Sequence, residues 1–439
     1  MRRSVVLEKE QEALSPRSTE EVAALRAKHI LPLPGPMYTR PVQIVRGRLQ
    51  YLYDEKGKKY LDGFAGVATV SIGHCHPHWL KKIQEQMREY FHAPALYLHP
   101  SLGLYAQRLL KLAQTANPEL DMCFFTNSGS EANELAALIA KNFTGSQEFV
   151  ALRHSYHGRT LMTMALTGQS NWRQSTPYGQ SVSFAEANYV YRGYRWKECL
   201  DDLQQTIRCA TPGRIAAFYA EPINGVGGVI TPEPEYFPGA YEIVKKAGGL
   251  FIADEVQTGV YRTGNDFLGI QKWGVRPDVV TMAKGLANGY PIGCVLTTRE
   301  IAQAMNGKLH YNTFGGGPVQ MAAAGAVFDV MEKENLPKNA HEVGTYLIAK
   351  LKKLAEKDPH VGEVRGMGLM IGVELVKDKK NKEPAPELAL KVLDSTKDRG
   401  LLIGKGGLSG NVLRIKPPLC ITKKDADFLV EVLEESLRA

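Results

Sequence analysis

The stretch Leu250-Phe251-Ile252-Ala253-Asp254-Glu255 decides the fold class of this 439-residue sequence. Four apolar residues follow one another without polar alternation, and two acidic residues end the run. Continuous apolarity of this length is typical of a strand that is covered on both faces, as in a parallel sheet. A second, mostly apolar run ends in the same abrupt way, because residues 279–283 are followed directly by Lys284.

Similar runs recur along the middle of the chain, at residues 122–125, 149–152, 215–220 and 293–296. Between several of them the pattern has a helical period. Residues 238–247 are one such segment, and another has apolar side chains at i, i+3, i+4 and i+7, namely Ala132, Leu135, Ala136 and Ile139. Strands that alternate with helices predict an α/β fold with a largely parallel sheet.

The two ends of the chain have a different pattern and predict a smaller α+β domain. Helices are expected at residues 319–334 and 342–356 and from about Asp425, with a strand at residues 368–375. The first 36 residues end in Leu31-Pro32-Leu33-Pro34-Gly35-Pro36 and are expected to form an extended arm outside the core. The predicted division is 1–70 (arm and part of the small domain), 71–316 (large domain) and 317–439 (C-terminal small domain).

Composition excludes several classes of protein. The hydrophobic content of 44% and charged content of 23% are typical of a globular protein, and no apolar run is long enough for a membrane span. The net charge of +8 suits anionic small molecules but is too mild and dispersed for nucleic acid. Glu8, Glu10 and Glu12 argue against a transit peptide, and the six scattered cysteines suggest free thiols in a reducing compartment. We therefore expect a cytoplasmic protein.

The short motif Gly73-His74-Cys75-His76-Pro77 superficially suggests a metal site. No second cluster of histidine, cysteine or acidic residues completes a coordination shell, so no metal is expected there. A nucleotide-binding P-loop is also excluded, because the sequence has no G-x-x-x-x-G-K pattern.

Chemically active side chains follow three of the predicted strands. The first strand leads into Ser128-Gly129-Ser130 and a helix, which can form either a phosphate cup or an ordinary N-cap. Asp254 ends a buried strand, where a carboxylate is costly without a cation or hydrogen-bond donors. It could pair with a cationic ligand, meet a structural arginine or cap a helix. Lys284 is either a Schiff-base nucleophile with a depressed pKa or a lysine that snorkels to solvent.

Carboxyl ends of parallel strands meet at one edge of a sheet, where ligands gather. A single molecule that carries a phosphate, a pyridinium nitrogen and an aldehyde would explain all three groups at once. Pyridoxal 5'-phosphate is such a molecule, and Asp254 would keep its ring an electron sink.

The sequence resembles the class III aminotransferases, which are fold-type-I pyridoxal-phosphate enzymes. The likeness runs in family order from about residue 37 to 430. Its motifs are residues 250–264 with 281–285, Gly73-His74-Cys75-His76-Pro77, Ser128-Gly129-Ser130-Glu131-Ala132, Tyr156-His157-Gly158-Arg159-Thr160, and residues 220–223, 312–316 and 365–372. The resemblance implies a large domain with a mostly parallel seven-stranded sheet flanked by helices, and a small domain built from both ends of the chain.

The resemblance also implies roles for individual residues around the cofactor. Lys284 would form the Schiff base and then move a proton as general base, while Asp254 would pair with the pyridine nitrogen. Tyr156 would stack on the ring and Gln257 would reach its hydroxyl group. The remaining cofactor-binding residues are expected to be Ser128, Gly129 and Ser130 at the phosphate, Thr313 from the partner subunit, and His157 and Glu221 near the ring.

Further implications concern assembly and substrate. The family predicts a homodimer with shared active sites, and a tetramer built from it stays open. Arg414 matches the arginine that grips a substrate carboxylate, with Tyr38 and Val67 on the substrate side. Val226 replaces the glutamate that screens this arginine in members using 2-oxoglutarate, and Val67 replaces an aromatic residue of ornithine-type members. Gly317, where the branch often has asparagine, is unexplained.

These departures favour the alanine–glyoxylate and 3-aminoisobutyrate–pyruvate branch. The expected reaction is ping-pong transfer of an amino group from alanine, β-alanine or a similar amino acid to glyoxylate or pyruvate. The alternatives are an ω-aminotransferase of the 4-aminobutyrate or ornithine type, a dialkylglycine decarboxylase and an amino-acid racemase.

Overall fold

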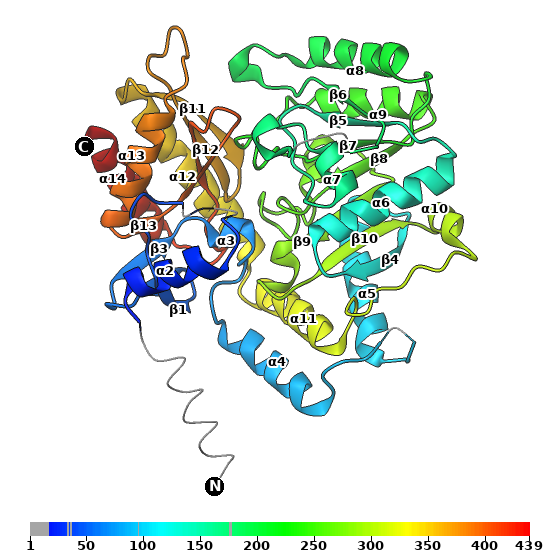
Figure 1. The fold of residues 1–439 in the computed structure, drawn as a ribbon, viewed down its shortest axis with the longest axis horizontal. Helices are drawn as coiled ribbons and strands as arrows, with labels where there is room; N and C mark the ends of the chain where they lie inside the picture. The colour runs from blue at the N-terminus through cyan, green and yellow to red at the C-terminus, as the bar shows by residue number, and fades with distance from the viewer. Residues whose placement is uncertain (1–16, 33–34, 36, 95, 175–177) are drawn as a thin grey trace.

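The largest sheet of the computed structural model has seven strands, in the order β4-β10-β9-β8-β7-β5-β6 (Figure 1). The structure describes residues 17–32, 35, 37–94, 96–174 and 178–439. The strands are β4 (Leu120–Thr126), β5 (Phe149–Leu152), β6 (Val182–Ala185), β7 (Ala217–Ala220), β8 (Leu250–Asp254), β9 (Val279–Ala283) and β10 (Gly293–Thr298). Only β10 runs antiparallel to its neighbours. The prediction of a mostly parallel seven-stranded sheet is therefore confirmed.

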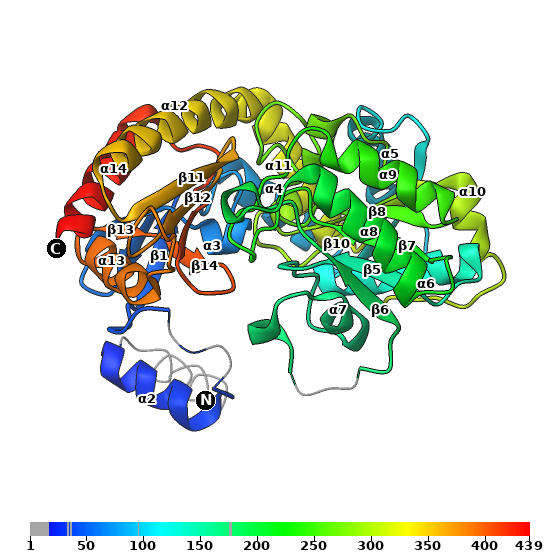
Figure 2. The same ribbon diagram turned by 90° about the horizontal axis from the view of Figure 1, so that it is seen from above.

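Both faces of this sheet are buried, as the continuous apolarity of its strands predicts. Along β5, Phe149 and Ala151 pack into one hydrophobic cluster, whereas Val150 and Leu152 pack into the other. Helices cover the two faces (Figure 2). The first cluster includes residues of α6 (Gly129–Thr144), α7 (Leu161–Leu166) and α10 (Arg299–Ala302), and the second includes residues of α4 (Pro77–Glu89), α5 (Pro100–Ala113), α8 (Trp196–Ala210), α9 (Tyr236–Lys246) and α11 (Pro318–Lys333).

Two four-stranded sheets come from the ends of the chain. The first has the order β1 (Ile44–Arg48), β2 (Tyr51–Asp54), β3 (Lys59–Asp62) and β13 (Leu401–Leu402). The second has the order β11 (Val361–Met367), β12 (Met370–Leu375), β15 (Val412–Ile415) and β14 (Gly404–Gly406). Because β13 pairs with β3, the two ends of the chain meet in one sheet, as expected.

Helices α12 (Leu336–Lys357), α13 (Pro386–Asp398) and α14 (Lys423–Arg438) accompany these sheets. The helices predicted near residues 319, 342 and 425 and the strand predicted at 368–375 are confirmed, although α12 already begins at Leu336 instead of residue 342. The short 3-10 helices are η1 (Ser170–Trp172), η2 (Val190–Arg192), η3 (Gly269–Trp273), η4 (Lys284–Ala287) and η5 (Gln303–Met305).

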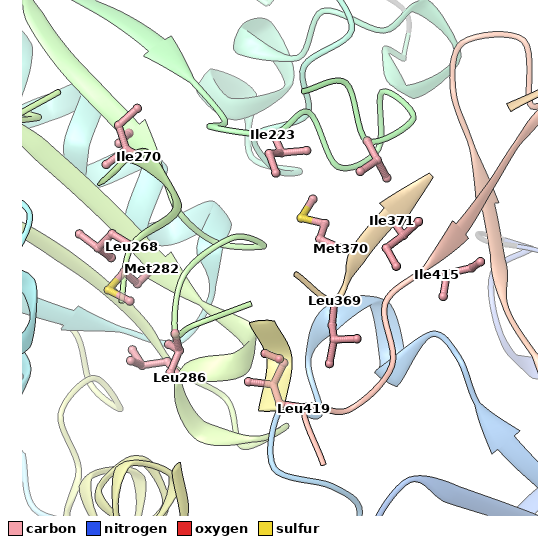
Figure 3. Packing of buried hydrophobic residues seen from close by; sticks show 14 of the residues in the cluster. Ile223, Leu268, Ile270, Met282, Leu286, Leu369, Met370, Ile371, Ile415 and Leu419 are labelled. Carbon is pink, nitrogen blue, oxygen red and sulfur yellow. The ribbon is translucent and has the colours of Figure 1, made fainter. Parts of the chain in front are cut away.

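One hydrophobic cluster joins the C-terminal segments to the large sheet. Figure 3 shows Met282 and Leu286, which flank Lys284, in the same cluster as Leu369, Met370 and Leu419 from the C-terminal part. This shared core fixes the C-terminal strands against the edge of the sheet at which Lys284 lies.

The expectation of an extended N-terminal arm is wrong for the residues that the structure describes. Thr19–His29 form a helix, α2, whose N-terminus has a capping box made by Ser18 and Glu21. None of its residues is buried, and Figure 2 shows α2 set apart from the rest of the chain. The rest of the predicted arm, residues 1–16, 33–34 and 36, lies outside the described residues. Within the described part of the chain, no helix has the length and apolarity that a membrane crossing requires.

A left-handed turn follows β3. Ala65, Gly66, Val67 and Ala68 (α3, Ala65–Ala68) have φ values of 48°, 58°, 68° and 60°. Non-glycine residues seldom adopt this conformation, which costs roughly 1–2 kcal/mol per residue. The Asp62 carboxylate accepts hydrogen bonds from the backbone N–H groups of Phe64 and Ala65 and thereby holds the start of the turn.

Two helical glycines predict opposite stability effects when each is replaced by alanine. A Cβ on Gly344 in α12 would lie 2.2 Å from the Gly368 carbonyl oxygen, whereas one on Gly325 in α11 would meet nothing within 4 Å. We expect Gly344→Ala to destabilise the protein by about 1–3 kcal/mol. Gly325→Ala should stabilise it by about 0.5–1 kcal/mol, because alanine loses less backbone entropy in a helix. Chemical denaturation of the two variants measures both effects, and equal shifts would contradict the packing described here.

Candidate functional site

The strand ends of the large sheet enclose a cavity of about 320 Å³. This volume lies at the lower end of the range for small-molecule sites. Nine of the residues singled out in the sequence line it together: Ser128, Gly129, Ser130, Tyr156, His157, Glu221, Asp254, Gln257 and Lys284. They are contributed by segments that follow β4, β5, β7, β8 and β9, because the carboxyl ends of these parallel strands meet at the same edge.

The Ser128-Gly129-Ser130 segment forms the N-terminus of the 16-residue helix α6. Ser128 is the N-cap, and its hydroxyl oxygen accepts from the Glu131 N–H. Glycines keep this corner open, since a Cβ on Gly158 would lie 2.5 Å from the Ser130 hydroxyl oxygen. The capping and phosphate-cup interpretations are therefore compatible, because one serine caps the helix and the helix end faces the cavity.

Asp254 is 4% exposed and carries a dense set of hydrogen bonds. One carboxylate oxygen accepts from the Asn133 amide at 2.8 Å and from the His157 ring Nδ1 at 2.7 Å, and the other accepts from the Val256 N–H. No arginine or lysine forms an ion pair with Asp254 among the described residues, so the structural-arginine interpretation does not apply. A cationic ligand in the cavity would complete its environment.

Lys284 follows β9 and has a φ of 45°, in the left-handed region. Its amine has no hydrogen-bond partner among the described residues. Burial, opposed by the charges of Asp254 and Glu221 and aided by nearby Arg414, lowers the pKa of Lys284 to about 8. The side chain lines the cavity instead of reaching bulk solvent. With a pKa of about 8, about a tenth of its amine is neutral and nucleophilic at about pH 7, far more than for an ordinary lysine.

Glu221 comes directly after β7 and ties two loops to the sheet. Its carboxylate accepts from the N–H groups of Tyr156 at 2.9 Å and Gly225 at 2.8 Å. Burial raises the pKa of Glu221 to about 7, so this group exchanges a proton near neutral pH. The Tyr156 ring packs edge-on against Trp172, with the centroids 5.2 Å apart, and Tyr156 lines the cavity.

Arg414 lies on β15, behind the cavity lining. Its Nε donates to the Lys405 carbonyl, its Nη1 donates weakly to the Gly225 carbonyl, and its guanidinium lies over the Phe64 ring. Burial lowers the pKa of Arg414 to about 10, and the negative charge of Glu221 opposes this shift.

The structure does not bring three other predicted residues into this cavity. The Tyr38 hydroxyl donates to the Ile403 carbonyl, and its ring lines a separate hollow beneath α2. Val67 lies in the left-handed turn, next to the cavity residue Thr69 but not itself in the lining. Thr313 is exposed, in the segment between η5 and α11.

Two site residues escaped prediction. Asn133 holds Asp254 and was hidden within the apolar face of α6, where it is the polar member of a buried stripe. Lys416 lies two positions after Arg414, and its amine donates to the Gln257 side chain. The signal that could have revealed it is the period of two in a strand, which puts both basic residues on one face.

The histidines of the Gly73–Pro77 motif have structural partners. His74 pairs with Asp62, the residue that holds the left-handed turn, and His76 pairs with Glu334. The described residues contain no group of three or more potential metal ligands. All six cysteines are free, as expected.

Known proteins resemble this chain over nearly its whole length. The model of the family described as aminotransferase class-III matches residues 36–437. A mitochondrial alanine–glyoxylate aminotransferase 2 homolog 2 from Arabidopsis thaliana is 48% identical over 96% of this chain and 88% of that protein. The human mitochondrial alanine–glyoxylate aminotransferase 2 is 39% identical over 95% and 86%, respectively. An (S)-enantioselective omega-transaminase from Thermomicrobium roseum superposes with a TM-score of 0.88, at 34% identity over 97% of this chain and 99% of that one.

These relatives contradict the expectation of a cytoplasmic protein, since both curated relatives are named mitochondrial.

The fold and the family agree with the chemistry of the strand ends. Class III aminotransferases depend on pyridoxal phosphate, as the cavity residues led us to expect. This chain belongs to the class III aminotransferases and is a pyridoxal-phosphate-dependent enzyme.

Proposed function

We propose that this aminotransferase moves an amino group from alanine, β-alanine or a similar amino acid to glyoxylate or pyruvate. One observation carries the proposal: Arg414 has no acidic side-chain partner among the described residues and bonds only to backbone carbonyls. Its guanidinium is therefore available to a substrate carboxylate. Val226, which carries no acidic group, lies near Arg414. Both residues are close to Gly406, where an added Cβ would lie 2.8 Å from the Arg414 Nε and 2.9 Å from the Val226 carbonyl oxygen. The names of the relatives, alanine–glyoxylate aminotransferase 2, support alanine and glyoxylate among these substrates.

The cavity residues fit pyridoxal phosphate. The glycine-lined N-terminus of α6, with Ser128, Gly129 and Ser130, suits the phosphate. Asp254, which pairs with no lysine or arginine among the described residues, suits a protonated ring nitrogen. Gln257 is proposed to reach the ring hydroxyl and Tyr156 to cover a ring face. When bound, the cofactor supplies an aldehyde that takes up the amino group and a ring that withdraws electrons.

Residues of the chain have separate roles around the bound cofactor. Lys284 holds the cofactor through its amine and, once released, carries a proton at Nζ as the general base. His157 and Asn133 orient the Asp254 carboxylate through their hydrogen bonds. Glu221, whose pKa burial raises to about 7, balances the positive charges of Arg414 and Lys284.

The proposal includes a homodimer in which Thr313 completes the phosphate site of the partner subunit. Its support is a surface of large exposed apolar side chains that surrounds the exposed Thr313 segment. This surface comprises Tyr90, Phe91, Leu96, Tyr97, Leu98, Leu309, Tyr311 and Phe314. His92 and Phe314 join its two parts, with ring centroids 5.7 Å apart. Such a patch is typical of an interface. A purely monomeric holoenzyme in sedimentation experiments would contradict this assembly.

We also propose the division into residues 1–70, 71–316 and 317–439. It is supported by the distribution of strands, since all strands of the large sheet lie between residues 120 and 298 and those of the small sheets lie outside that range.

Substrate preference should follow the carboxylate-binding role of Arg414. Alanine should convert the holoenzyme, and glyoxylate or pyruvate should restore it faster than 2-oxoglutarate. Arg414→Met should lower kcat/KM for alanine by about 10–100-fold, because a charged hydrogen bond contributes about 1.5–3 kcal/mol. A primary amine without a carboxylate is the control and should be nearly unaffected. Release of carbon dioxide or inversion of the amino acid instead of oxo-acid formation would contradict aminotransfer.

The pH dependence of cofactor loading should report the lowered pKa of Lys284. Only the neutral amine attacks the aldehyde, so the apoenzyme should load pyridoxal phosphate faster as the pH rises, with a midpoint near the pKa of about 8. An ordinary lysine would have its midpoint more than two pH units higher, near 10.4. Absorption spectroscopy of Schiff-base formation measures the rate, and Lys284→Ala, the control, should form none. A rate that keeps rising beyond pH 10 would refute this explanation.

A further inference from the structure

The mechanism gives no role to Lys416, a buried basic residue that contacts the cavity residue Gln257. Lys416 directly follows β15, and its residue surface is 0% exposed. Burial, together with the positive charges of Arg414 and Lys284, lowers the pKa of Lys416 well below its ordinary value. Burying a lysine beside other positive charges costs free energy of folding. The contacts of the Lys416 amine indicate a function that explains its position.

The Lys416 amine donates two hydrogen bonds. One goes to the Gln257 side-chain Oε1 at 2.7 Å and the other to the Gly225 carbonyl at 3.3 Å. The oxygen end of the Gln257 amide faces the amine in the structure, and an ammonium group, which can only donate, excludes the reversed amide. A neutral amine also offers the two N–H groups that these two oxygens accept.

Gly225 closes the other side of the Gln257 amide. A Cβ on Gly225 would lie 2.4 Å from the Gln257 Nε2 and 2.6 Å from its Oε1. The amide is therefore packed directly on the Gly225 backbone while its oxygen is bonded to Lys416. Gln257 lines the cavity, and its Nε2 has no acceptor among the described residues.

We propose that Lys416 is a positioning residue that keeps the oxygen of the Gln257 amide bonded to its own amine and the N–H groups turned to the cavity. Gln257 then presents hydrogen-bond donors, and only donors, to an oxygen on the cofactor ring. This inference rests on the proposed contact between Gln257 and the ring hydroxyl group.

The orientation has a chemical result. An N–H donor stabilises an ionised oxygen, whereas an amide oxygen in its place would repel it. Without Lys416 the amide is free to rotate by 180° and to present its oxygen to the ring. The bound ring oxygen would then hold its proton to higher pH, and the cofactor would bind less tightly.

A double-mutant cycle in the holoenzyme tests this chain of contacts. The variants are Lys416→Met, Gln257→Ala and the double variant, and the readouts are the cofactor dissociation constant and the pH midpoint of the absorption change of the bound cofactor. We expect Lys416→Met to weaken cofactor binding about tenfold and to move the midpoint upward by up to about one pH unit. In the Gln257→Ala background it should change neither quantity further.

A matched control separates this role from mere burial of a lysine. Lys397 in α13 is 5% exposed, and its amine donates to the Arg40 carbonyl, away from the cavity. Lys397→Met should lower the thermal stability but leave the absorption midpoint and the cofactor dissociation constant unchanged.

The outcomes are distinct. An unchanged spectrum in Lys416→Met, or an equal shift in both Gln257 backgrounds, overturns the inference. An unchanged spectrum in Gln257→Ala refutes instead the proposed contact of Gln257 with the ring. If Lys416→Met does not fold, Gly225→Ala displaces the same amide and should give the same upward shift, and its failure to do so overturns the inference.

Discussion

The site depends on keeping ionisable groups away from water at one edge of a parallel sheet. An isolated buried carboxylate is unstable by several kcal/mol, and Asp254 is stabilised by donors from Asn133, His157 and Val256. These donors belong to α6, to the loop after β5 and to the turn after β8. Hydrogen bonds that satisfy one charge thus lock three segments together. Exclusion of water also lowers the pKa of the Lys284 amine and so makes it reactive. The burial that requires the hydrogen bonds of Asp254 is therefore the same burial that activates Lys284.

Positive charge dominates the deeper part of the site. Arg414 and Lys416 lie on one face of the strand around β15 and share the Gly225 carbonyl as an acceptor. Glu221 accepts the Gly225 N–H, so the loop between β7 and α9 is held from both sides. A surplus of buried basic side chains over acidic ones favours ligands that bring negative charge, and both a phosphate ester and an α-carboxylate do so.

Much of this could be predicted because the informative signals are local. Apolar runs predicted the strands, and the residues just after them predicted the cavity, since parallel strands end together. Periodicity could not predict that β10 is antiparallel, because a buried run looks alike in either direction. The helix α2 was missed although Ser18 and Glu21 carry a capping-box pattern, since the proline-rich segment after it suggested an extended arm. The contact between Lys416 and Gln257 joins residues 159 positions apart and follows only from the folded chain.

The backbone of residues 65–68, beside the cavity, is strained because its φ values are positive. A free peptide of this sequence would relax to right-handed backbone, so the turn persists only because its surroundings enforce it. Ala65 and Ala68 are buried, and Asp62 grips the first N–H groups of the turn while it pairs with His74. The position of the cavity residue Thr69 therefore depends on the stability of the small sheet that contains Asp62. A substitution that destabilises this sheet, even far from Lys284, would therefore increase the mobility of residues 65–69 before it moved the reacting groups.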